Sequence, residues 1–172
     1  MAGDLPRRDK VLTDVITEVD RRLDGELPMD VPGVEHTFRD ASTLAGALHV
    51  RWSATLAAHV ERELVAQPDD PEAAVVRAWR RAARELPGVR MVLDRLVDQA
   101  RGPELARLHR REARQRQWLA HRAGLSSNPR TLDDDAVLRG EQLELAGRRY
   151  FDPHARKPRR SLVERIRAAL TS

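Results

Sequence analysis

The chain has 172 residues, the size of one domain, and 41% of them are hydrophobic, which is enough for a buried core. It contains no cysteine, which excludes disulfides, thiolate metal sites and cysteine nucleophiles. No apolar run approaches the roughly 20 residues that span a bilayer, and residues 1–23 lack the apolar segment of a secretory signal. We therefore expect a cytoplasmic protein without a membrane span.

The formal charge of +4 is unevenly distributed. Residues 1–100 hold 14 basic and 18 acidic side chains, whereas residues 101–172 hold 17 basic and 9 acidic ones. This asymmetry indicates either an acidic partner for the C-terminal part or a charge match between the two parts of the chain.

Helical spacing of apolar residues dominates the N-terminal half. The first predicted helix covers residues 9–24, with Gly25 as its end, and a proline-containing loop follows. A longer helix is predicted from Thr37 to Gln67, because Thr37 and Asp40 have the spacing of a capping box and Pro68 stops the pattern.

Strong start signals define the next helices. Asp70 and Pro71 fit the N-cap and the first position of a helix that ends near Leu86, and a further helical segment covers residues 89–100. Gly102 and Pro103 open an arginine-rich helix that ends at Gly124.

The C-terminal third is harder to assign. Residues 124–131 are the clearest linker, and residues 131–151 fit either a short helix capped by Thr131 and Asp134 or a small hairpin within 141–151 that turns at Gly147. A short amphipathic helix is predicted after Ser161.

These elements predict an all-α fold: a compact antiparallel bundle of five or six helices. We assign residues 1–125 to the bundle and residues 126–172 to a basic C-terminal extension with a short terminal helix, which packs on the bundle within a single domain. The sequence does not decide whether residues 131–172 fold without a partner.

The arginine-rich helix is amphipathic at 100° per residue. Leu105, Leu108, Leu119 and Ala123 share one face, and the opposite face carries Arg107, Arg110, Arg111 and Arg114, with Trp118 beside them. A second basic patch follows near the C-terminus and consists of Arg156, Lys157, Arg159 and Arg160.

Guanidiniums at this spacing bind carboxylates or phosphates in a bidentate manner. The sequence therefore favours a non-enzymatic interaction or regulatory module whose partner is an acidic protein surface, a nucleic acid or a second copy of the chain. A solvated helix face is the alternative, since 29 of the 31 basic residues are arginine.

A metal-binding bundle is the other function considered. His59 and Glu63 share a face of the second long helix, and His109 and Glu112 lie on or near the leucine face of the arginine-rich helix. If these two helices packed together, the four side chains would converge as inward-facing metal ligands do. The spacings differ from the Glu-x-x-His pairs of ferritin-like proteins, and no catalytic motif is present, so we expect no enzymatic activity and no cofactor.

Overall fold

The computed structural model describes residues 8–127 and 131–154, and these residues form helices without any strand. The bounds of the helices are α1 Arg8–Arg22, α2 Val34–Thr37, α3 Ala41–Ala66, α4 Pro71–Glu85, α5 Pro87–Gln99, α6 Gly102–Arg122 and α7 Asp134–Arg148. The all-α prediction is therefore confirmed, with seven helices in the described ranges where five or six were expected. None of these helices is long and apolar enough to cross a membrane.

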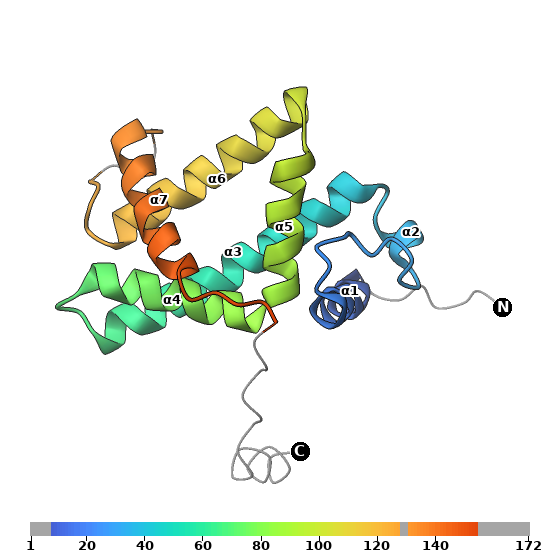
Figure 1. The fold of residues 1–172 in the computed structure, drawn as a ribbon, viewed down its shortest axis with the longest axis horizontal. Coiled ribbons are helices and arrows are strands. Elements are labelled where there is room, and N and C mark those ends of the chain that lie inside the picture. Colours follow the sequence, from blue (N-terminus) through green and yellow to red (C-terminus); the bar gives the residue numbers. More distant parts are fainter. Residues whose placement is uncertain (1–7, 128–130, 155–172) are drawn as a thin grey trace, which may run out of the picture.

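The helices pack into a compact bundle around α3 (Figure 1). A short turn joins α3 to α4 and lets the two helices run antiparallel, while α7 lies on both α6 and α4, and α1 lies on α5. Trp52 of α3 and Trp79 of α4 meet edge to face at the centre, with ring centroids 5.8 Å apart. Aliphatic side chains from α1, α3, α5 and α6 surround this pair.

Side-chain capping explains where α3, α4 and α7 begin. Asp70 accepts a hydrogen bond from Ala73 N, and Pro71 occupies the first turn of α4, as predicted. The predicted start at Thr37 is wrong, because Thr37 ends the separate helix α2. Asp40 adopts an extended backbone and accepts the Thr43 N–H at 2.7 Å, which makes it the N-cap of α3.

The segment that fitted either a helix or a hairpin is helical. The α7 helix continues through Gly147 to Arg148, and its N-cap is Asp133, which accepts a hydrogen bond from Asp135 N, rather than Thr131. The predicted boundary after residue 125 falls in the connection from α6 to α7 and stays a prediction. The terminal helix predicted after Ser161 lies outside the described residues.

Candidate functional site

The four arginines predicted to contact a partner lie on α6 and are all exposed. They occupy positions i, i+3, i+4 and i+7 of the helix, and we call them the arginine stripe: Arg107, Arg110, Arg111 and Arg114. None of the four side chains forms a hydrogen bond or an ion pair with any residue that the structure describes.

The other arginines of α6 hold the helix in place. Arg116 forms ion pairs with Glu141 and Glu144 of α7, each at 3.0 Å. Arg122 forms an ion pair with Glu61 of α3 at 2.7 Å. The arginines of α6 outside the stripe therefore form ion pairs that link α6 to α7 and α3.

The leucine face docks over only part of its length. Leu119 and Ala123 are buried, whereas Leu105 and Leu108 are half-buried. The C-terminal half of α6 packs against α7, but its N-terminal half extends away from α7 and has only limited contact with α5 (Figure 1). The predicted amphipathic orientation is thus complete only towards the C-terminal end.

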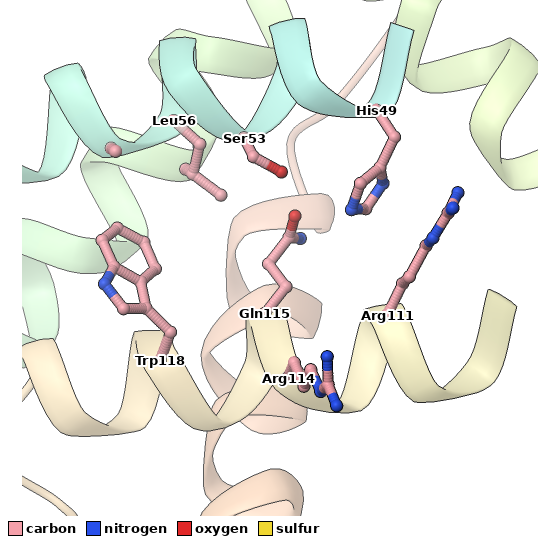
Figure 2. A pocket seen from close by; sticks show the side chains of 8 residues that line it. His49, Ser53, Leu56, Arg111, Arg114, Gln115 and Trp118 are labelled. Atoms are coloured by element: carbon pink, nitrogen blue, oxygen red, sulfur yellow. The ribbon is translucent and has the colours of Figure 1, made fainter. Parts of the chain in front are cut away.

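A recess of about 390 Å³ separates α3 from α6. His49 and Leu56 reach from α3 towards α6, and Gln115 and Trp118 reach from α6 towards α3 (Figure 2). The lining consists of His49, Ser53, Leu56 and Ala57 of α3 and Arg111, Arg114, Gln115 and Trp118 of α6. Three predicted partner-binding residues, Arg111, Arg114 and Trp118, are therefore brought to one cavity.

A smaller cavity continues the same groove towards the N-terminal end of α6. It has a volume of about 110 Å³, and Arg107 and Arg111 border it opposite Ser42 and Ala45 of α3. The sequence placed the arginine stripe opposite the leucines. In the structure, three of its four members also border cavities that α6 shares with α3.

Two polar groups in the recess have unusual surroundings. Burial, together with the positive charges of Arg111 and Arg90, holds the pKa of His49 below its ordinary value of 6.5, so its imidazole is neutral at pH 7. The side-chain carbonyl oxygen of Gln115, Oε1, is buried and accepts no hydrogen bond from the described part of the chain. A buried carbonyl without a donor is uncommon and costs free energy.

The residues considered for metal binding lie in two separate networks. Arg62 can only donate, so Nδ1 of His59 is the acceptor of the hydrogen bond between them. The ring proton is therefore on Nε2, which donates to Glu85 at 2.8 Å. Glu63 forms ion pairs with the arginines of α4, Arg77 and Arg81.

His109 is exposed, and Glu112 is half-buried beside α5, where burial raises its pKa despite the nearby Arg116 and Arg90. The structure does not bring these two residues to His59 and Glu63, because α6 packs mainly on α7. Among the described residues, no group of three or more histidine, aspartate or glutamate side chains could hold a metal ion.

The second predicted basic patch, Arg156, Lys157, Arg159 and Arg160, lies outside the described residues. Another set of arginines, which was not predicted from the sequence, lies on α4. Its segment 77–84, RAWRRAAR, has the same arginine spacing as RLHRREAR at 107–114. In α4 these side chains serve the fold: Arg77 and Arg81 contact Glu63, and Arg80 donates to Ala146 O and lies over the Tyr150 ring.

No protein-family model, curated protein sequence or solved structure matches this chain.

Proposed function

We propose that the protein is a non-enzymatic interaction module that binds an acidic protein surface through the arginine stripe of α6. One observation carries this proposal. Two helices have arginines at the same spacing, yet those of α4 are mostly engaged with glutamate, a backbone carbonyl and an aromatic ring, whereas those of α6 have no such contacts with the described residues.

The arginine stripe does not serve the stability of α6. Like charges three or four residues apart on a helix destabilise it by roughly 0.2–0.5 kcal/mol per pair, and the stripe contains several such pairs. An acidic partner would relieve this repulsion, and each planar guanidinium can donate two parallel hydrogen bonds to one carboxylate. Arginine is also enriched in protein interfaces.

A protein partner is favoured over a nucleic acid. Duplex binding depends on many basic contacts to phosphates, but Ser42, Ala45 and Ser53, which face the stripe from α3, carry no charge. Stacking of nucleic-acid bases needs an aromatic ring on the open surface, whereas Trp118 is half-buried and faces the recess between α3 and α6.

The test is a double charge reversal, Arg107→Glu with Arg110→Glu. We expect the affinity for a fluorescently labelled glutamate-rich peptide to fall at least 10-fold. Each lost charge-assisted hydrogen bond costs about 1.5–3 kcal/mol, and the two remaining arginines of the stripe offset part of this loss. Fluorescence anisotropy at two salt concentrations measures this, with a glutamine-substituted peptide and a 20-base-pair DNA duplex titrated in parallel.

The matched control reverses two exposed arginines elsewhere, Arg51→Glu with Arg139→Glu, so that the net charge changes equally. Neither of these arginines has an ion pair within the described ranges. An equal loss in both double variants would show that only net charge matters and would contradict the proposal. Tighter binding of the duplex, lost on reversal of the stripe, would replace the protein partner with nucleic acid.

A further inference from the structure

The geometry points to the recess between α3 and α6 as a binding site for a small amphipathic carboxylate whose aromatic body carries an N–H donor. This inference goes beyond the proposed function, because it concerns a small molecule rather than a protein surface. It rests on the size of the recess, on two unpaired cations at its edge and on the covered acceptor of one lining residue, Gln115 Oε1.

The size and lining of the recess suit a small molecule. Its volume of about 390 Å³ lies within the range of roughly 300–1,000 Å³ that is typical of ligand sites. Leu56, Ala57 and the Trp118 indole provide apolar walls, and few polar groups converge on the space between them (Figure 2). A flat aromatic body would bury its surface between the two helices.

The charge at the edge of the recess favours an anionic ligand. Arg111 and Arg114 line the recess, and neither forms an ion pair within residues 8–127 and 131–154. No acidic side chain lines this recess. A carboxylate on the ligand would accept hydrogen bonds from these guanidiniums in a partly apolar setting, where such bonds are strong.

The buried acceptor specifies the second polar group of the ligand. Gln115 points from α6 towards α3, between Ser53 and His49, and its Oε1 has no donor in the described part of the protein (Figure 2). Only an N–H or O–H group can satisfy a carbonyl oxygen. A ligand that carries this group on an aromatic body would supply the missing hydrogen bond after a small rotation of the amide.

Three probes separate these contributions: indole-3-acetate, indole-3-acetamide, which lacks the negative charge, and 1-naphthylacetate, which lacks the N–H group. Isothermal titration calorimetry on the full chain is expected to give saturable 1:1 binding of indole-3-acetate. We expect binding of the acetamide to be at least 10-fold weaker and that of the naphthyl probe roughly 3- to 10-fold weaker, the range for one net hydrogen bond.

Two substitutions assign the binding to the recess. Ala57→Leu fills the recess and should abolish binding, whereas Ala58→Leu places the same side chain at the exposed neighbouring position and should leave binding unchanged. Gln115→Leu should remove the preference for indole over naphthyl while keeping the preference for the carboxylate. Circular dichroism and thermal unfolding verify that each variant is folded.

Absence of saturable binding by all three probes to the folded wild-type protein would overturn the inference. Full binding by folded Ala57→Leu, or an indole preference that survives Gln115→Leu, would also overturn it. Arg111 and Arg114 are shared with the arginine stripe, so the ligand would compete with an acidic protein there. The two proposals nevertheless fail separately, because Ala57→Leu leaves the stripe intact and reversal of Arg107 and Arg110 leaves the lining of the recess intact.

Discussion

Gly140→Ala is expected to force α7 away from α6 and to lower the free energy of unfolding by roughly 3 kcal/mol. A Cβ atom at Gly140 would lie 1.8 Å from the carbonyl oxygen of Arg116 and 2.3 Å from its carbonyl carbon. Both atoms belong to the backbone of α6, so no side-chain rotation can relieve the overlap, and overpacking of this kind costs about 1–3 kcal/mol or more. Urea unfolding followed by far-ultraviolet circular dichroism measures the loss.

Gly46→Ala provides the matched control in α3. A Cβ atom at Gly46 would meet no atom within 4 Å, apart from its own helix backbone and neighbours. Alanine is the better helix former, so this variant should be more stable by about 0.5–1 kcal/mol. A Gly140→Ala protein as stable as wild type would show that α6 and α7 are not in close backbone contact.

The boundaries of α4 and α6 could be predicted because their signals are local. Asp70 with Pro71, and Gly102 with Pro103, act within one helical turn, so neighbouring residues contain all the information needed. The start of α3 was misjudged because Thr37 and Asp40 have capping-box spacing, and only the backbone geometry shows that Asp40 caps the helix that follows it.

The packing partner of α6 could not be predicted, because it depends on contacts between residues far apart in the chain. The expected approach of His59 to Glu112 assumed that α6 packs mainly on α3. Instead, Gly140 lets α7 approach the α6 backbone, and Gly147 lies against the Trp79 ring. In the sequence, the alternating pattern of residues 142–151 and the turn signal at Gly147 left a hairpin as an open alternative.

The candidate site was predictable only on its α6 side. A periodicity of 100° per residue placed Arg111, Arg114 and Trp118 on one side of that helix, and the structure brings them to one recess. The opposite wall contains His49 and Ser53, and no pattern within α3 marks these two positions. A comparison of residues 77–84 with 107–114 reveals the repeated arginine spacing in the sequence. It does not show which of the two segments has arginines that form ion pairs within the fold.

Arg148→Met is expected to lower the free energy of unfolding at pH 7 by roughly 2 kcal/mol, which is less than for a fully buried ion pair, because the side chains of Arg148 and Asp94 are 27% and 32% exposed. Arg148 donates to both carboxylate oxygens of Asp94, at 2.9 and 2.7 Å, and also binds Glu144. Each carboxylate keeps a second arginine, Arg90 for Asp94 and Arg116 for Glu144, which limits the loss. Methionine retains the apolar stem and contributes no charge.

The effect of Arg148→Met should depend on pH in a defined direction. Burial alone would raise the pKa values of Asp94 and Glu144, but the hydrogen bonds and charges of the arginines outweigh it and hold both below their ordinary values of 3.8 and 4.5. The stability that these groups contribute is therefore present above their ordinary values and is lost as the pH falls through the lowered ones. In Arg148→Met both pKa values return towards normal, so the unfolding free energies of the two proteins should begin to converge as the pH falls below the ordinary values of 3.8 and 4.5, and should meet only below the lowered values.

Urea unfolding at pH 7 and at about pH 3.5 measures this convergence, and Lys10→Met serves as the control. Lys10 forms an exposed pair with Asp14, and its removal should change stability by only about 0.3–0.5 kcal/mol. A difference between wild type and Arg148→Met that stays constant with pH would assign the loss to packing against the Trp79 ring, over which the Arg148 guanidinium lies at 5.2 Å. Convergence at low pH would identify the Asp94–Arg148–Glu144 network as an electrostatic link between α7 and α5 that stabilises the fold.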